Sequence, residues 1–253
     1  MTFSEDNIYK LIAHRDTILV AREALKQYKS MMDGDFSFLK RIRKTRVTGL
    51  PVDTLVVDAA VNDLPILLYG PTKRSEGTYA TEIRGALERL STGLAKAGVS
   101  PDRGGQYYEI TGTARDFRVL STVCDSYTRV RLGQLGYAIE GLPQQWSGGL
   151  KWLHELRHLC ESYNDATVGV SSGSSLGIGH KDASPKKEVA CDLHQAIRYR
   201  LAWDRTPEGG MTVDFGTPMH YSGVPMPLLE AVPPGVAPSK RSKKLLSNTE
   251  GWF

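Results

Sequence analysis

Residues 107–132 read YYEITGTARDFRVLSTVCDSYTRVRL, and this stretch decides the fold class. The first five residues alternate in polarity, as in a strand with one buried face. Thr113 can then cap a helix from Ala114 to about Leu132, because its hydroxyl can accept a hydrogen bond from a backbone N–H of the first turn. The inner stripe of this helix is expected to contain Phe117, Leu120, Cys124, Tyr127 and Val130.

Helical patterns lie on both sides of this stretch. Apolar residues at helical spacing predict helices over residues 5–31, 78–97, 150–161 and 184–203. Residues 52–69 are ambiguous between strand and helix, and Pro65 predicts two separate pieces there. A short strand is expected at residues 211–215, after Gly209-Gly210. We therefore expect an α+β fold, predominantly helical with a few short strands, and we see no repeated sequence motif.

The segment between residues 98 and 105 is rich in glycine, proline and other breakers, and predicts a linker. On this basis the chain divides into an N-terminal lobe, residues 1–100, and a C-terminal lobe, residues 106–230. Residues 231–253 contain many prolines, lysines and serines, and predict a flexible basic tail.

Composition excludes some classes of protein. The 253 residues are 40% hydrophobic and 24% charged, and no apolar run approaches the length of a membrane span. Acidic residues near the N-terminus argue against a signal peptide. The three cysteines occur singly, which is typical of a reducing compartment. These features predict a protein of the cytoplasm without membrane contact.

Two basic runs account for the formal net charge of +4. They are residues 40–46 and 240–244, and either could bind nucleic-acid phosphates by counterion release. Neither run is interleaved with aromatic residues, so solvated segments remain the simpler interpretation. The sequence contains no P-loop and no GxSxG motif.

The stretch LHELRH at 153–158 contains an HExxH pattern. On a helix, His154 and His158 project from one face and could share a zinc ion, while Glu155 could activate a bound water molecule. Glu188, His180 and His194 are possible third ligands. Arg157 would oppose the cation, and a solvated polar helix face is the alternative. The preferred interpretation has no cofactor, and zinc belongs to the alternative one.

Two further groups of residues could bind an anionic ligand. Arg129, Arg131 and Gln134 close one expected helix, whereas Arg198, Tyr199 and Trp203 lie near the end of another. Guanidinium groups suit phosphate, and aromatic rings suit a base. Cations in a last helical turn can also simply stabilise the helix dipole.

Residues 110–120 with 125–134, and residues 191–203 with 209–215 and 225–227, resemble an uncharacterised family of small proteins encoded by bacteriophages and prophages. The resemblance covers about residues 107–230. It implies an accessory protein that works in the cytoplasm of the bacterial host. No catalytic residues can be carried over from this family.

The leading hypothesis is therefore a non-enzymatic phage protein that binds a host protein or an anionic, nucleotide-like ligand to counter host defence. A zinc-dependent hydrolase and a nucleic-acid-binding protein are the two alternatives. The sequence leaves the ligand, the host target and the oligomeric state open.

Overall fold

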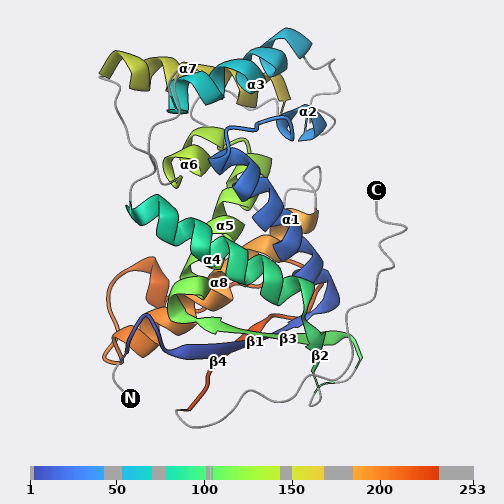
Figure 1. Cartoon of the computed structure of the whole chain (residues 1–253), viewed down its shortest axis with the longest axis vertical. Helices are drawn as coiled ribbons and strands as arrows, with labels where there is room; N and C mark the ends of the chain where they lie inside the picture. Colours follow the sequence, from blue (N-terminus) through green and yellow to red (C-terminus); the bar gives the residue numbers. More distant parts are fainter. Residues whose placement is uncertain are drawn as a thin grey trace.

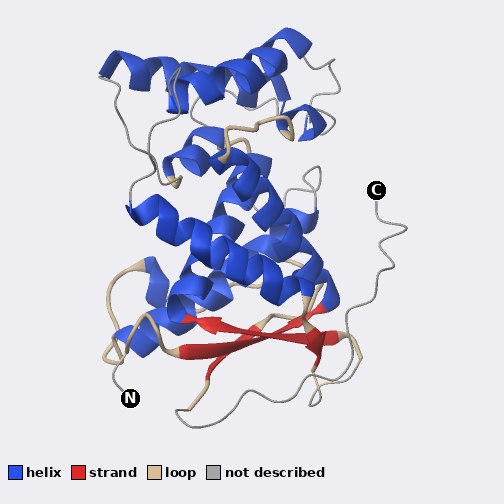
Figure 2. Ribbon diagram, viewed as in Figure 1, coloured by secondary structure: helices blue, strands red, loops and turns tan. Residues whose placement is uncertain are grey.

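The computed structural model of the chain describes residues 3–42, 53–69, 78–100, 103, 105–142, 150–167 and 185–233. Helices predominate, and a small antiparallel sheet lies at one end of the molecule (Figures 1 and 2). The expected α+β class is confirmed. The strands are β1 (Ile8–His14), β2 (Gly98–Val99), β3 (Tyr107–Thr113) and β4 (Leu228–Ala231). The helices are α1 (Arg15–Met32), α2 (Leu39–Ile42), α3 (Thr54–Tyr69), α4 (Thr78–Ala95), α5 (Ala114–Arg131), α6 (Leu135–Glu140), α7 (Leu150–Thr167) and α8 (Pro185–Arg205), with a 3-10 helix, η2, at Val213–Phe215.

The sheet has the strand order β2-β3-β1-β4, and every neighbouring pair is antiparallel. The chain passes from β1 to β2 through α1–α4, and from β3 to β4 through α5–α8. Each passage skips one strand of the sheet, which is the connectivity of a split β-α-β unit, present here twice. Because β1 lies between β3 and β4, the two ranges expected to form separate lobes contribute to one sheet.

The two halves of the chain repeat the same order of elements. Within the described residues, each half has a seven-residue strand that leads directly into an 18-residue helix, and three further α-helices and a strand follow, with η2 as an addition in the second half. The middle residues of the two long strands, Leu11 and Ile110, face each other in the sheet. Counted from the start of each strand, buried Tyr28 matches buried Tyr127. The structure thus contains an internal repeat that the sequence did not reveal.

The end of the first long helix in each half supports this repeat. Gly34 and Gly133 occupy the same position, and both have a positive φ, 77° and 73°. This left-handed conformation suits glycine because a side chain would crowd the backbone. Both helices therefore end in the same kind of turn.

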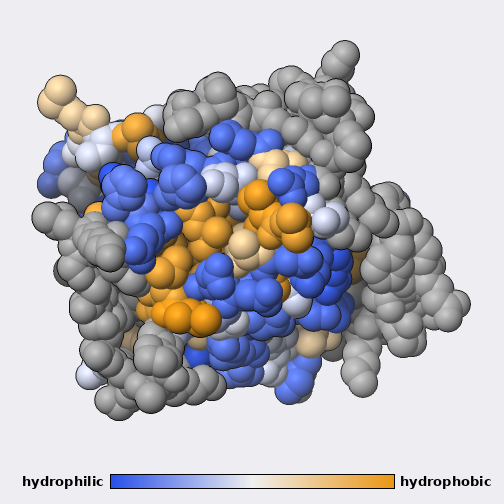
Figure 3. Space-filling view, turned by 90° about the horizontal axis from the view of Figure 1, so that it is seen from above, coloured by the Kyte–Doolittle hydropathy of each residue, from blue (hydrophilic) through white to orange (hydrophobic). Residues whose placement is uncertain are grey.

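The core lies between the helices and one face of the sheet (Figure 2). Tyr9, Leu11 and Ala13 of β1 are buried toward the helices, as is Ile110 of β3. Farthest from the sheet, α3 and α7 pack together as a separate layer (Figure 1). Hydrophobic residues gather on the face seen from above (Figure 3). Two apolar side chains of α3, Leu55 and Ile66, are exposed. Among the described helices, none is both long and apolar enough for a membrane crossing.

The expected helix over residues 5–31 is wrong at its start, because residues 8–14 form β1. Ile8, Leu11 and Ile12 fit a helical period, but positions 9, 11 and 13, which are buried together with Ile12, follow the two-residue period of a strand. The helix begins at Arg15, after His14 accepts a hydrogen bond from the N–H of Asp16. Histidine is not a preferred N-cap, so the sequence offered no clear start signal.

The expected break at Pro65 is also wrong, because α3 runs through it. Proline removes one intrahelical donor and crowds the preceding turn. Burial of Leu64 and Leu68 compensates, since these residues pack in the core on both sides of Pro65. Tyr69 at the end of α3 donates a hydrogen bond to the carbonyl of Met31, which ties the helix to α1.

Other boundaries agree with expectation or differ in detail. The strand expected at 107–111 is confirmed and extends to Thr113, and the Thr113 cap and the helices α4, α5 and α8 are confirmed. The helix that contains HELRH is longer than expected and reaches Thr167. The expected strand at 211–215 is wrong, because its last three residues form η2. Most of the two basic runs and of the expected tail lies outside the described residues.

Candidate anion-binding pocket

One face of α4 carries a polar stripe with a gap in its middle. Thr78, Glu82, Gly85 and Arg89 are spaced by four, three and four residues, so they lie above one another on the helix. Gly85 leaves the middle of the stripe without a side chain. A Cβ added there would lie 3.4 Å from Nη1 of Arg89, which shows that this guanidinium lies over the glycine.

Arg89 is held in place by the first turn of α5. Its Nε and Nη2 donate to Oδ1 of Asp116 at 3.0 and 2.7 Å. Asp116 is itself buried, and its Oδ2 accepts from the N–H of Thr113, whose hydroxyl accepts from the N–H of Asp116. This reciprocal capping box fixes the carboxylate, and the carboxylate fixes Arg89. The remaining nitrogen, Nη1, stays beside Gly85.

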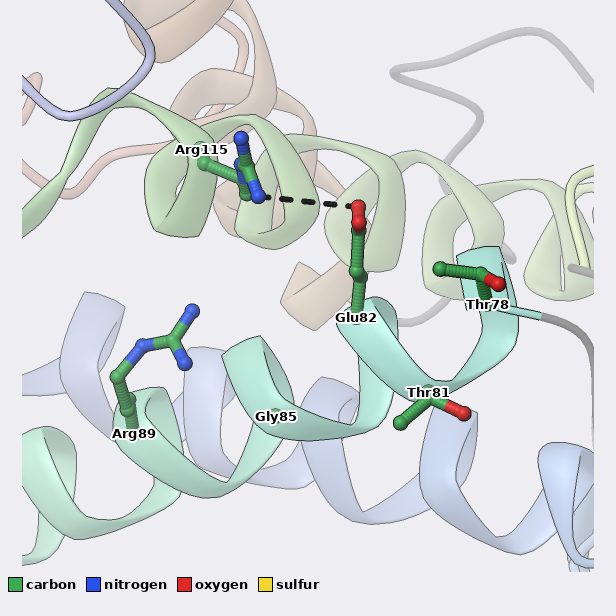
Figure 4. Close-up of a pocket in the computed structure, with 6 residues that line it drawn as sticks. All are labelled: Thr78, Thr81, Glu82, Gly85, Arg89 and Arg115. Atoms are coloured by element: carbon green, nitrogen blue, oxygen red, sulfur yellow. Dashed lines mark ion pairs between the residues drawn. The ribbon is translucent and has the colours of Figure 1, made fainter.

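Arg115 brings a second guanidinium from α5. Its Nη1 lies 3.7 Å from Oε2 of Glu82, and both side chains are partly exposed. In Figure 4, Arg89 and Glu82 project from α4 toward α5, and Arg115 points back toward Glu82. The space between them is a surface pocket open to solvent, with a volume of about 440 Å³, also lined by Thr78, Thr81 and Gly85. This volume is typical of small-molecule sites.

The donors that the cavity offers to an anion are guanidinium groups and not the backbone N–H groups at the start of α5. The N–H groups of Ala114 and Arg115 already donate to the carbonyls of Asn7 and Glu5. Two guanidinium groups from different helices can each offer a planar fork to a phosphate or carboxylate. The pocket is therefore chemically suited to an anion.

The residues expected to bind a ligand at the end of α5 are engaged inside the protein. Arg129 donates to Asp125 and Gln134 at 2.7 and 3.2 Å. The Arg131 guanidinium lies 3.3 Å from the ring centroid of Tyr127 and also bonds to Glu23 and Gln27. Burial lowers the pKa of Arg131, and the neighbouring Tyr127 and Glu23 oppose this shift. The network ties α5 to α1.

The expected group near the end of α8 holds a neighbouring segment. Arg198 donates to the carbonyl of Val213 in η2. Trp203 packs edge-on against Tyr199 and Phe215, with centroid distances of 6.2 and 5.5 Å. The aromatic rings thus anchor the segment that follows α8.

The structure does not bring these two groups together. Ser121 of α5 lies beside His194 of α8, and Thr128 lies beside Lys187. The pairs show that the two helices run antiparallel, so Arg129 and Arg198 lie toward opposite ends of the helix pair. A single site that uses both groups is not formed.

The HExxH residues lie on the exposed face of α7. His154, Glu155 and His158 are all exposed, whereas Leu156 and Cys160 are buried. Glu188 lies on α8, where its carboxylate accepts from Lys187 at 3.3 Å. Within the described ranges no three His, Cys, Asp or Glu residues form a metal-binding group. Glu188 therefore does not join the two histidines as a third ligand in this structure. His180 lies outside the described residues, and His194 bonds to Ser121.

The α4–α5 pocket was not predicted from the sequence. Its one local signal is Gly85, because a glycine inside a helix costs stability. The pairing of Arg89 with Asp116 joins residues from the two halves of the chain, so no local pattern contains it.

No protein-family model, no curated protein and no solved structure matches this chain.

Proposed function

We propose that the protein is a non-enzymatic binding protein that captures a small, phosphate-bearing ligand of the nucleotide-like class in the pocket between α4 and α5. The observation that carries this proposal is the fixed position of Arg89. Asp116 accepts hydrogen bonds from two of its nitrogens, so the guanidinium group is oriented before a ligand binds. A preoriented donor loses less conformational entropy on binding than a mobile one.

Arg115 supports the same function from the other wall of the cavity. Its ion pair with Glu82 is 3.7 Å long and partly exposed, so it is weak and can rearrange around a ligand. The resemblance to phage and prophage proteins supplies a biological setting. In that setting, sequestering a nucleotide-like compound or a host factor in the bacterial cytoplasm would counter host defence.

Calorimetric titration with orthophosphate, sugar phosphates and nucleotides tests the proposal. We expect saturable binding to at least one phosphate ester, and a loss of about tenfold or more in affinity in Arg115→Gln. Arg22→Gln is the matched control, because Arg22 is an exposed arginine on α1. Absence of binding to every phosphate compound would contradict the proposal, and so would an equal loss in the control.

The floor of the pocket offers a second pair of variants. Gly85→Leu places a side chain beside Nη1 of Arg89, whereas Gly93→Leu adds the same side chain to the same helix, where no atom lies within 4 Å of a Cβ. Both changes improve helix propensity. We expect only Gly85→Leu to abolish binding.

A further inference from the structure

We infer that the ligand of the α4–α5 pocket is a phosphorylated sugar, recognised through its phosphate and its hydroxyl groups together. This inference rests on the proposed function and narrows it to a substrate class. The charges around the cavity balance one another. Two guanidinium groups, of Arg89 and Arg115, are balanced by two carboxylates, of Asp116 and Glu82. A bare phosphate dianion would therefore gain hydrogen bonds from the guanidinium groups but little net Coulomb attraction.

The two carboxylates have different roles. Asp116 is buried, and both of its oxygens already accept hydrogen bonds. Glu82 is half exposed and lines the cavity, and at 3.7 Å its distance to Arg115 is too long for a hydrogen bond. Glu82 therefore keeps acceptor sites that face the ligand. A compound that carries donors as well as a phosphate would use them.

The donors that Glu82 accepts from are expected to be neutral. Arg115 already balances the charge of Glu82, so a ligand ammonium group would place a second cation beside that guanidinium. Hydroxyl groups bring no charge, and a carboxylate accepts strong hydrogen bonds from them. Thr78 adds a hydroxyl group to the lining, which can donate to or accept from a sugar.

The pocket offers no platform for a nucleobase. Its lining residues in the described part of the chain are two threonines, a glutamate, a glycine and two arginines, without an aromatic ring. Base recognition generally uses stacking on aromatic rings, and no such ring lines this pocket in the described part of the chain. A nucleotide would therefore bind through its sugar and phosphate.

Calorimetric titration of the full chain with ribose 5-phosphate, orthophosphate and adenosine monophosphate tests this inference. We expect ribose 5-phosphate to bind at least about tenfold more tightly than orthophosphate, since hydrogen bonds to a charged acceptor are strong. Glu82→Ala should remove this preference while leaving orthophosphate binding unchanged or tighter. Glu140→Ala, which removes an exposed carboxylate from α6, should preserve the preference.

The outcomes separate this inference from the proposed function. Equal affinity for ribose 5-phosphate and orthophosphate overturns the inference but keeps phosphate binding, and so does an equal loss for both ligands in Glu82→Ala. Adenosine monophosphate bound tenfold more tightly than ribose 5-phosphate also overturns it, because the base would then be recognised. If none of the three compounds binds but another phosphate ester does, the inference of a sugar phosphate is contradicted and the proposed function is kept. Absence of binding to every phosphate compound contradicts the proposed function itself.

Discussion

Asp116 performs two tasks at the start of α5, since it completes the capping box and orients Arg89. Asp116→Asn keeps the shape of the side chain but weakens both sets of bonds. We expect the free energy of unfolding to fall by about 2 kcal/mol, from the cap and the charged hydrogen bonds together. Urea denaturation followed by circular dichroism measures this change. Arg115→Gln, which touches only a long exposed ion pair, should change stability by less than about 0.5 kcal/mol.

His194 is a partly buried titratable residue between α5 and α8. Burial lowers its pKa below the ordinary value of 6.5, and its Nδ1 lies 3.1 Å from the carbonyl of Ser121. The folded state thus favours the neutral ring, and the unfolded state takes up the proton first as the pH falls through 6.5. Neutral His194 therefore stabilises the folded state above pH 6.5, and this stabilisation declines as the pH falls below 6.5.

We therefore expect the free energy of unfolding to fall between about pH 7.5 and about pH 5.5, and to fall less in His194→Gln. Glutamine cannot gain a proton in this range but can still form hydrogen bonds. Urea denaturation of both proteins at the two pH values gives the four free energies required. An equal fall in both proteins would assign the pH dependence to other groups.

At the level of single elements, α7 tests the HExxH alternative. Its two histidines are exposed and form no metal-binding group with other described residues. We expect His154→Ala and His158→Ala to change the free energy of unfolding by less than about 0.5 kcal/mol, as is usual at a solvated helix face. Elemental analysis of protein purified without added metal is the second measurement. One equivalent of bound zinc, lost in either variant, would restore the hydrolase hypothesis.

How much of each element the sequence predicted depends on how local its signal is. The β3–α5 unit was predicted because polarity alternation, the Thr113 cap and the apolar stripe all lie within one stretch. β1 was missed because its short apolar run fits two periods, and its pairing with β3 joins residues far apart in the chain. α3 continues through Pro65 because of tertiary packing, which no local rule contains.

The candidate site depends even more on contacts between residues that are far apart in the sequence. Arg129, Arg131 and Arg198 were expected to bind a ligand because they lie near helix ends. In the structure they form internal contacts instead. Arg89 and Arg115 look ordinary in the sequence. They become a pair only when α4 packs against α5.

At the scale of the whole molecule, the interleaved sheet predicts cooperative unfolding of both halves. All four tryptophans lie after residue 106, so their fluorescence reports on the second half alone. Leu25 of α1 is buried in the shared core, and Leu25→Ala should cost about 2–5 kcal/mol. We expect the fluorescence midpoint to shift as far as the circular dichroism midpoint. A fluorescence transition that does not move would show that the halves unfold separately.

Nuclear magnetic resonance titration of the labelled protein with ribose 5-phosphate shows whether the α4–α5 pocket is the ligand site. We expect the largest saturable shifts at the backbone amides of Gly85, Arg115 and Asp116, while the indole N–H of Trp203 does not move. Saturable shifts that cluster around Arg198 and Trp203, with Gly85 unchanged, would contradict this expectation.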